Sequence, residues 1–279
     1  MDVAMATSAG HPGRPNEDFV GAVPGAVVLL DGAGIPGSAS LCRHGTAWYT
    51  HRLGGSLLGW LSRDDGRALS GILADAIDHV AREHRDTCDL GHPNSPQATV
   101  ALFRAGGDRA DYLMLADSHL LLGAPGDAPV VITDERETTV RQSCLQRLDG
   151  LLPGTKAYEA ERASVGAEMR TRRNHPGGYW IAKDDPLAAG HAVTGVVPVA
   201  ADTHVALLSN GVTRLVDAYR VETWASLLER CRTDGAVEVL RVLREHEAGG
   251  SAVDGSVLPT DDATVASCSL SRRSRRGRS

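Results

Sequence analysis

The stretch AVVLLDGAG, residues 26–34, joins a short apolar run to a carboxylate and two glycines. A short apolar run that is bounded by a turn signal is typical of a buried β-strand. The run ends at Asp31, and an Asp-Gly pair at a strand end most often only forms a turn. The stretch therefore predicts a strand over residues 26–30, with Asp31 either as a turn residue or as part of a site.

Three further segments with carboxylates are spread over the chain: RPNED at 14–18, ADS at 116–118 and DDAT at 261–264. Singly, each is more typical of an ordinary loop or corner. Asp117 is less ordinary, because it separates two apolar runs and an unpaired buried carboxylate is costly. Carboxylate and carbonyl oxygens suit Mg²⁺ and Mn²⁺, whereas softer metals prefer Cys and His. Together the segments predict a site that activates water on a metal.

The composition is that of a globular chain, with 279 residues, 42% hydrophobic and 23% charged. The net charge of -6 is uneven, because residues 271–279 carry five arginines and no acid and leave -11 on the rest. An acidic body fits carboxylates gathered around cations. We expect the arginine-rich end to be a disordered tail, and only this tail has a charge suited to nucleic acid.

The five cysteines are odd in number, far apart in sequence and free of any C-x-x-C pair. This spacing argues against a zinc site and against a disulfide framework. Reduced and mostly buried thiols in a cytoplasmic protein are the simplest interpretation. The N-terminus shows no signal peptide, and no stretch approaches the ~20 apolar residues of a membrane-spanning helix.

Hydrophobic periodicity predicts a mixture of strands and helices. Strands are expected at 3–7, 26–30, 98–103, 112–116, 120–123, 130–133, 204–209 and 263–270, and helices at 41–61, about 69–80, 158–172, 221–231 and 235–246. Asp64 or Asp65 is the expected cap of the second helix. Short connections between 98 and 133 predict an antiparallel meander. The irregular segment of about 136–192 is a candidate flap, within one domain over residues 1–270.

Taken in order, the motifs resemble those of the metal-dependent protein phosphatase family called PP2C, or PPM. The pattern of that family runs R-x-x-N-E-D, D-G-x-G, G-T-T-A, G-D-S, T-x-D-H, S-D-G and D-N or D-D before a closing strand. The counterparts here are Arg14 with NED at 16–18, DGAG at 31–34, a loose PQATV at 96–100, ADS at 116–118, TDE at 133–135, SNG at 209–211 and DDATV at 261–265. The resemblance covers roughly residues 3–270, and the order of the motifs is more specific than any one of them.

The resemblance implies an α+β fold, a four-layer α/β/β/α sandwich of two antiparallel sheets flanked by helices. It also implies a phosphomonoesterase that acts on phosphoserine or phosphothreonine in proteins. Two Mg²⁺ or Mn²⁺ ions, with a third as an option, would activate the attacking water. The metal ligands implied by the resemblance are Asp18, Asp31, the carbonyl of Gly32, Asn210 and Asp261.

Within that set, the resemblance makes Asp31 the bridge between the two ions. Glu17 would lie beside the first ion, and Arg14 would clamp the phosphate oxygens. Asp117 is the candidate ligand of a third, looser ion or a group that orients another ligand.

Arg14 lies one residue nearer the acidic pair than in many relatives, and three further positions depart from the pattern of the family in residue type. Asn210 replaces the Asp of S-D-G, and the lost charge should weaken one cation site. Ala116 replaces the Gly of G-D-S, which we expect to be mild. Ala33 stands where some relatives carry a His, so a general acid is missing there. Because of Asn210, a pseudophosphatase that binds a phosphoprotein without turnover remains the alternative, and another hydrolase on the same fold is a third reading.

Overall fold

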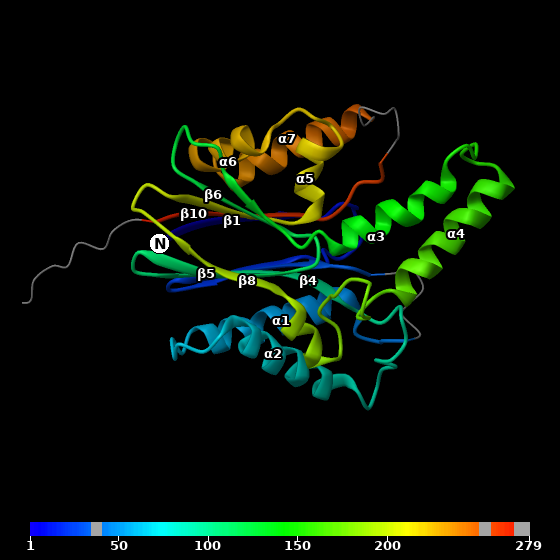
Figure 1. The fold of residues 1–279 in the computed structure, drawn as a ribbon, viewed down its shortest axis with the longest axis horizontal. Coiled ribbons are helices and arrows are strands. Elements are labelled where there is room, and N and C mark those ends of the chain that lie inside the picture. The colour runs from blue at the N-terminus through cyan, green and yellow to red at the C-terminus, as the bar shows by residue number, and fades with distance from the viewer. Residues whose placement is uncertain (35–40, 251–257, 271–279) are drawn as a thin grey trace, which may run out of the picture.

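The computed structural model describes residues 1–34, 41–250 and 258–270. Within them, two five-stranded antiparallel sheets pack face to face and helices cover both outer faces (Figure 1). This arrangement confirms the expected four-layer α+β sandwich. The arginine-rich end at 271–279 lies outside the described residues.

The chain passes several times between the two halves of the sandwich. The strands are β1 (Asp2–Ser8), β2 (Phe19–Val23), β3 (Ala26–Gly32), β4 (Ala98–Gly106), β5 (Arg109–Leu115), β6 (His119–Gly123), β7 (Val130–Ile132), β8 (Val193–Pro198), β9 (His204–Leu208) and β10 (Ala263–Ser269). The helices are α1 (Gly45–Leu61), α2 (Leu69–His84), α3 (Arg136–Leu145), α4 (Lys156–Thr171), α5 (Asn210–Asp217), α6 (Trp224–Thr233) and α7 (Ala236–Gly249), with short 3-10 turns η2 (Gln146–Leu148) and η3 (Pro186–His191).

The strand β3 is apolar on both faces because it lies inside a sheet that is covered on both sides. This sheet has the order β2-β3-β4-β5-β8. Val27 and Leu29 belong to the core between the two sheets, whereas Ala26, Val28 and Leu30 belong to the core under α1 and α2. Side chains alternate along a strand, so a continuous apolar run serves two cores at once.

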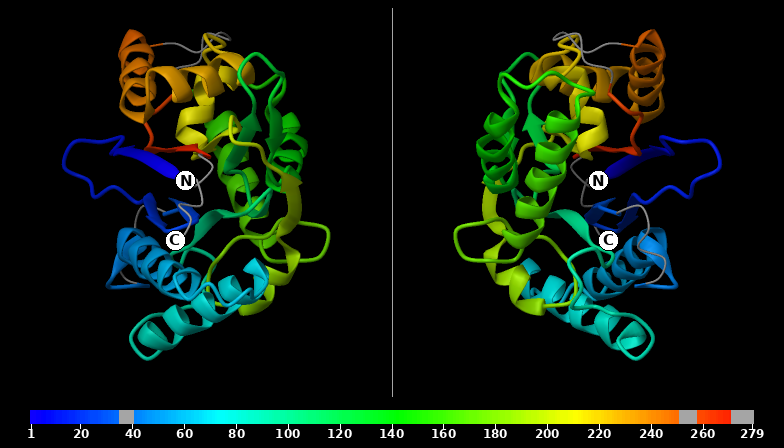
Figure 2. Two further views of the ribbon diagram at one scale, coloured as in Figure 1. Left: turned by 90° about the vertical axis from the view of Figure 1, so that its left-hand side faces the viewer. Right: turned by 90° about the vertical axis from the view of Figure 1, so that its right-hand side faces the viewer.

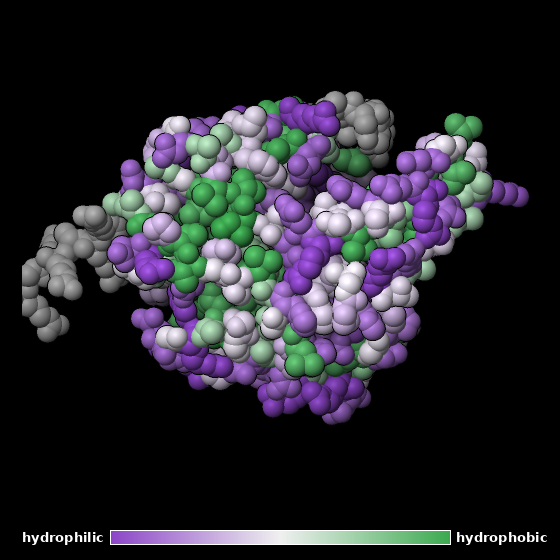
Figure 3. All heavy atoms as spheres, viewed as in Figure 1, coloured by the Kyte–Doolittle hydropathy of each residue, from purple (hydrophilic) through white to green (hydrophobic). Residues whose placement is uncertain are grey.

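The second sheet has the order β1-β10-β9-β6-β7 and carries α5, α6 and α7 on its outer face. The two further views show α6 and α7 on one side of the paired sheets and α1 and α2 on the other (Figure 2). Apolar side chains gather on part of the face drawn in Figure 3, and exposed valines lie on the edge strands, at Val130 and Val131 in β7 and Val196 in β8. No helix within the described ranges is long and apolar enough to cross a membrane.

The predicted meander is wrong at its middle. The strands β4 and β5 pair with each other, and so do β6 and β7, but β5 and β6 belong to different sheets. The chain crosses between the sheets at residues 116–118. Ala116 has a φ of 65° there, a left-handed conformation that costs a non-glycine residue about 1–2 kcal/mol. The local hydrophobic pattern cannot show that the chain passes from one sheet to the other, because the side chains of each strand keep their own alternation.

Other local predictions also needed correction. The helix α2 has Ala68 as its N-cap and no capping side chain, so neither Asp64 nor Asp65 is its cap. The helix α1 begins at Gly45, four residues later than expected. Asn210 begins the helix α5 directly after β9, and this helix was not predicted. The strands β2 and β8 and the helix α3 were not anticipated.

The segment predicted as a flap consists of two parts. The helices α3 and α4 project from the sandwich as a pair (Figure 1), with a small core of their own around Val140, Cys144 and Val165. The returning part is built into the body, because Ala188 and Ala189 of η3 are buried in the core under α1 and α2. Only the α3–α4 pair therefore has the form of a projecting arm.

Candidate functional site

Asp31 lies at the end of β3, on the face that Val27 and Leu29 direct toward the second sheet. Its side chain is buried, and its Oδ2 accepts a hydrogen bond from the backbone N–H of Asn210 at 3.0 Å. Asn210 is the first residue of α5. The N-terminus of a helix carries a partial positive charge, so the end of one strand and the start of a distant helix together hold this carboxylate.

Asp18 lies directly before β2 and is 3% exposed. Its Oδ2 accepts a hydrogen bond from Thr264 Oγ1 of β10 at 2.7 Å. Its Oδ1 is buried and has no hydrogen-bond partner among the described residues. A buried oxygen without a partner costs about 1–3 kcal/mol, and a cation at this position would remove that cost.

The carboxylates of the site strongly affect one another. Burial raises the pKa of Asp31 well above its usual value, and the charges of Asp18, Asp117 and Asp261 raise it further. Burial likewise raises the pKa of Asp18 to about 7, and the charge of Asp262 adds to this effect. Like charges held this close favour either a proton or a cation between them. Acids that are distant in the sequence have therefore been brought together.

Two adjoining clefts open above these acids. A cleft of about 590 Å³ is lined by six of the predicted residues: Arg14, Glu17, Asp31, Gly32, Asn210 and Asp261. A second cleft, of about 690 Å³, shares Asn210 and Asp261 with the first and adds Asp117. Asp18 lies buried next to Asp31, and the exposed Arg14 lies at the rim of the first cleft. The structure thus brings every predicted site residue to one end of the sandwich.

The glycines of DGAG are required by the packing of Glu17. A Cβ atom at Gly32 would lie 2.3 Å from the backbone oxygen of Glu17, and one at Gly34 would lie 2.4 Å from its Oε2. Burial raises the pKa of Glu17, and the charge of Asp262 adds to this, while the N–H of Gly34 and the hydroxyl of Thr46 oppose it. The two glycines therefore leave the space in which Glu17 packs beside the site.

The two acids of DDAT have different surroundings. Asp262 accepts hydrogen bonds from the backbone N–H of Gly10 at 2.7 Å and of Glu17 at 2.6 Å, so both its oxygens fix the preceding loop. Asp261 is about half exposed and forms an ion pair with Arg214 at 2.6 Å. Gly211 is required here as well, since a Cβ would lie 2.1 Å from the Asp262 carbonyl oxygen. Both acids line the first cleft, but the oxygens of Asp262 already accept backbone hydrogen bonds, so Asp261 is the better candidate ligand of the pair.

Asp117 is held by three of the weaker motifs. Thr99 Oγ1 and Ser118 Oγ share a buried hydrogen bond of 2.6 Å, and Asp134 Oδ2 accepts from the Ala116 N–H at 3.2 Å. Asp117 itself forms an ion pair of 2.7 Å with Arg141, which comes from the projecting helix α3. These contacts join residues of PQATV, ADS and TDE into one buried network around Asp117.

Sequence reasoning missed the two arginines that pair with site acids. Arg214 lies one helical turn after Asn210, so the spacing within α5 was a usable signal once that helix was known. Arg141 lies in an unpredicted helix, and no local pattern links it to Asp117. Thr264 was inside a quoted motif without a role, and it proves to be the hydrogen-bond donor to Asp18.

The donor set suits a hard divalent cation. It consists of carboxylate, amide and carbonyl oxygens without sulfur or imidazole, which is the chemistry of Mg²⁺ and Mn²⁺. The unpartnered oxygen of Asp18 and the mutual repulsion around Asp31 fit the same ion class. The residues present therefore fit a metal centre.

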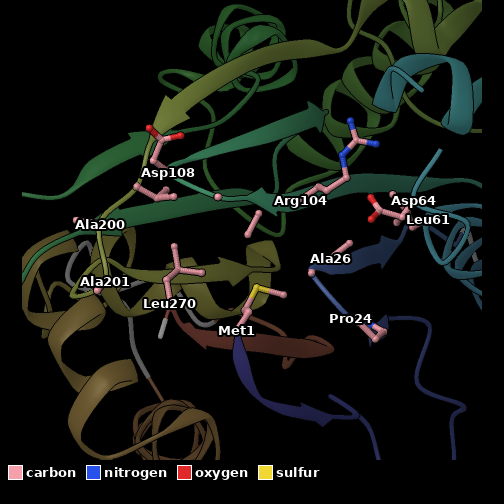
Figure 4. Close-up of a pocket in the computed structure, with 14 residues that line it drawn as sticks. Met1, Pro24, Ala26, Leu61, Asp64, Arg104, Asp108, Ala200, Ala201 and Leu270 are labelled. Atoms are coloured by element: carbon pink, nitrogen blue, oxygen red, sulfur yellow. The ribbon is translucent and has the colours of Figure 1, made fainter. Parts of the chain in front are cut away.

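Another cleft, of about 710 Å³, lies at the opposite end of the sheets. It is lined by the start of β3 at Ala26, the turn between β4 and β5, and apolar side chains such as Met1 and Leu270 (Figure 4). Its guanidinium, on Arg104, is already paired with Asp111 at 2.5 Å. Because this cleft lacks converging unpartnered acids among the described residues, the acidic end is the better candidate site.

Solved structures resemble this chain over nearly its whole length. The serine/threonine phosphatase PstP/Ppp of Mycobacterium tuberculosis has a TM-score of 0.60 at 16% identity and covers 97% of this chain and 98% of its own. The serine/threonine phosphatase Stp1 of Staphylococcus aureus has a TM-score of 0.62 at 13% identity, with 96% and 94% covered. The catalytic domain of PstP in complex with two manganese ions has a TM-score of 0.57 at 17% identity, with 97% and 98% covered.

At these identities the likeness shows the fold. A search of curated proteins finds no significant sequence match. The sequence profile described as Protein phosphatase 2C, however, matches residues 6–244. This range contains all the predicted site residues except Asp261, and the chain therefore belongs to the protein phosphatase 2C family.

Proposed function

We propose that this chain is a divalent-metal-dependent phosphatase that hydrolyses phosphoserine and phosphothreonine in proteins. The observation that carries the proposal is the buried, unpartnered Oδ1 of Asp18 beside the crowded carboxylate of Asp31, in a chain of this family. The manganese complex of PstP supports the choice of ion. All five cysteines are free thiols, which fits the cytoplasm as the working compartment.

The residues that would hold two ions are those that line the cleft and its floor. Asp31 would be shared, with Asp18 and the Gly32 carbonyl on one side and Asn210 and Asp261 on the other. When bound, Mg²⁺ or Mn²⁺ would supply Lewis-acid activation of water for in-line attack on phosphorus. The N–H of Asn210 fixes the Asp31 carboxylate, and Thr264 fixes that of Asp18.

Substrate binding would fall to Arg14. Its side chain is exposed at the rim of the cleft that contains Asp31. A guanidinium binds phosphate oxygens in a bidentate manner, which gives both charge and orientation. Asp117 would support a third ion in the adjoining cleft, provided that it exchanges its pairing with Arg141 for the ion. The projecting pair α3–α4 carries Arg141, so it is a candidate flap that contacts the protein substrate.

The alternative, a pseudophosphatase, has no support from the family or from the solved structures named above. Asn210 is the observation that suggested it, because this residue supplies an amide where the family pattern has a carboxylate. The two functions predict different outcomes in the same assay, since a pseudophosphatase would bind a phosphopeptide without releasing phosphate.

The test compares the wild type with Asp31→Asn, in assays of phosphopeptide hydrolysis with Mn²⁺ and of Mn²⁺ binding by calorimetry. Even supporting residues of metal sites contribute ~10–100-fold, so we expect Asp31→Asn to lose at least about 100-fold in turnover and to weaken Mn²⁺ binding. Asp108→Asn, in the cleft at the opposite end, is the matched control and should behave as the wild type. A wild type that binds phosphopeptide without turnover at millimolar Mn²⁺ would establish the pseudophosphatase instead.

A further inference from the structure

Two cysteines and two histidines meet away from the acidic site. Cys42 and His44 lie just before α1, His84 ends α2, and Cys88 follows it. One ligand atom from each of the four lies within 4.8 Å of all the others. The spacing is C-x-H in one loop and H-x-x-x-C some forty residues later, so neither half matches a common zinc pattern by itself.

Four of the six separations between these atoms are close to those around a tetrahedral ion. Cys42 Sγ lies 3.2 Å from Cys88 Sγ, 3.9 Å from His44 Nδ1 and 3.8 Å from His84 Nδ1, and Cys88 Sγ lies 3.4 Å from His44 Nδ1. Zinc bonds of ~2.3 Å to sulfur and ~2.0–2.1 Å to nitrogen place tetrahedral ligands about 3.3–3.8 Å apart. Small shifts of the side chains would therefore complete the coordination.

The surroundings hold the four groups in place. Cys42 and His84 are buried, with 1% and 2% exposed, while the other two are half-buried. The N–H of Asp89 donates to the carbonyl of Leu41 at 2.9 Å and ties the two loops together. The ring of His44 stacks on Trp48 with centroids 4.3 Å apart. The imidazoles are thus oriented by packing, which is typical of a built site rather than a chance encounter.

We propose that Cys42, His44, His84 and Cys88 form a structural zinc site that joins the start of α1 to the end of α2. The protein fills all four positions, which is the mark of a structural rather than a catalytic zinc. Thiolate and imidazole ligands select zinc over Mg²⁺ and Mn²⁺, so this site and the acidic site take different ions. This proposal departs from the expectation from cysteine spacing, which argued against a zinc site.

Zinc binding at this cluster would also influence the wall of the acidic cleft, through the first turn of α1. Thr46 lies in the first turn of α1, two residues after His44, and its hydroxyl contacts Glu17. Binding through Nδ1 places the proton of His44 on Nε2. The exposed Arg43, whose Nε lies 3.4 Å from that nitrogen, must then turn away.

The test begins with the full chain purified without added metal, and with zinc measured by mass spectrometry of the elements. We expect about one zinc per chain, released by a mercurial reagent that captures thiolates. Reconstitution with Co²⁺ should give the intense visible bands and the thiolate charge-transfer band of tetrahedral sulfur and nitrogen coordination. Cys88→Ser and His44→Gln should lose the zinc and these bands, and both half-buried positions tolerate the change in size.

Cys144→Ser, which changes a buried thiol of α3 outside the cluster, is the matched control and should keep the zinc. Asp31→Asn should also keep it, which separates this site from the acidic one. Purified protein that neither contains nor takes up zinc, or variants that retain a full equivalent, would overturn the proposal. So would a thiol count that reveals a disulfide between Cys42 and Cys88 in place of two metal-binding thiols.

Discussion

Arg214 Nη2 lies 2.6 Å from Asp261 Oδ2, and Arg214 Nη1 donates to the carbonyl of Pro259 at 2.6 Å. The guanidinium thus pairs with Asp261, the acid of DDAT that lines both clefts. A cation at Asp261 would compete with this ion pair, or would share the carboxylate with it. The arrangement makes Arg214 a built-in competitor of the metal.

Replacing Arg214 should therefore strengthen the binding of metal. Arg214→Met removes the competing charge, and we expect the Mn²⁺ dissociation constant to fall at least about threefold, which corresponds to a modest electrostatic term near the surface. Calorimetric titration with Mn²⁺ measures it. Arg241→Met, in a surface ion pair of α7, controls for the change in net charge. Weaker binding by Arg214→Met would mean that this arginine positions Asp261 rather than competing for it.

A substitution at Asn210 should also strengthen metal binding, by adding a ligand charge instead of removing a competing one. Its backbone N–H already donates to Asp31, and its side chain lines both clefts. Asn210→Asp keeps the shape and adds one ligand charge, so we expect about tenfold tighter Mn²⁺ binding, as ligand charge count determines affinity for hard cations. Titration of phosphopeptide turnover against Mn²⁺ should show half-maximal activity at a lower concentration. An unchanged titration curve would place this side chain outside the coordination sphere.

The sequence contained most of the acidic site and little of its surroundings. Asp18, Asp31 and Asp261 could be predicted because the order of the motifs along the chain is informative even where each motif alone is weak. Their pairing with Arg141 and Arg214 was not predictable, since these contacts depend on how α3 and α5 pack. The sandwich itself came from the resemblance. Strand periodicity could not separate a meander from strands that alternate between two sheets, because both give the same pattern of burial.

The cluster at Cys42 shows the same limit from the opposite side. Cysteine spacing argued against zinc, yet the antiparallel packing of α1 and α2 brings the start of one helix to the end of the other. A search for close pairs within the sequence cannot find ligands that two helices contribute from distant ends. The glycines at 32, 34 and 211 are a third case. Glycine is required at these positions because a Cβ atom would collide with Glu17 or Asp262, which the local sequence does not reveal.

Two adjacent glycines of α1 should respond in opposite directions. A Cβ at Gly54 would lie 2.2 Å from the ring of Phe19, which follows Asp18, whereas a Cβ at Gly55 meets nothing within 4 Å. Gly54→Ala should destabilise the fold by about 1–3 kcal/mol through overpacking and weaken Mn²⁺ binding by displacing Asp18. Gly55→Ala should stabilise it by about 0.5–1 kcal/mol, because alanine favours the helix. Urea denaturation measures both, and equal effects would contradict this assignment of space.

His204 provides a test of pH dependence away from both metal sites. It is buried in β9, with Nε2 2.9 Å from Ser267 Oγ and Nδ1 3.4 Å from Ser269 Oγ. Burial lowers the pKa of His204, and Arg232 lowers it further, while Glu229 opposes them. The unfolded chain therefore binds a proton before the folded one does as the pH falls below about 6.5. This residue should make the protein less stable on acidification.

Asp18 and Glu137 act in the opposite direction, because their pKa values are raised to about 7 and the folded state gains protons first as the pH falls. The effect of His204 is therefore isolated as a difference between variants. The free energy of unfolding of the wild type minus that of His204→Gln should decrease as the pH falls from about 7.5 to 5.5. Only the wild type has an imidazole that stays neutral in the folded state but gains a proton in the unfolded state. His175→Gln, at an exposed position, controls for loss of a histidine. A difference that stays constant over this range would show that His204 is as accessible to protons in the folded state as in the unfolded one.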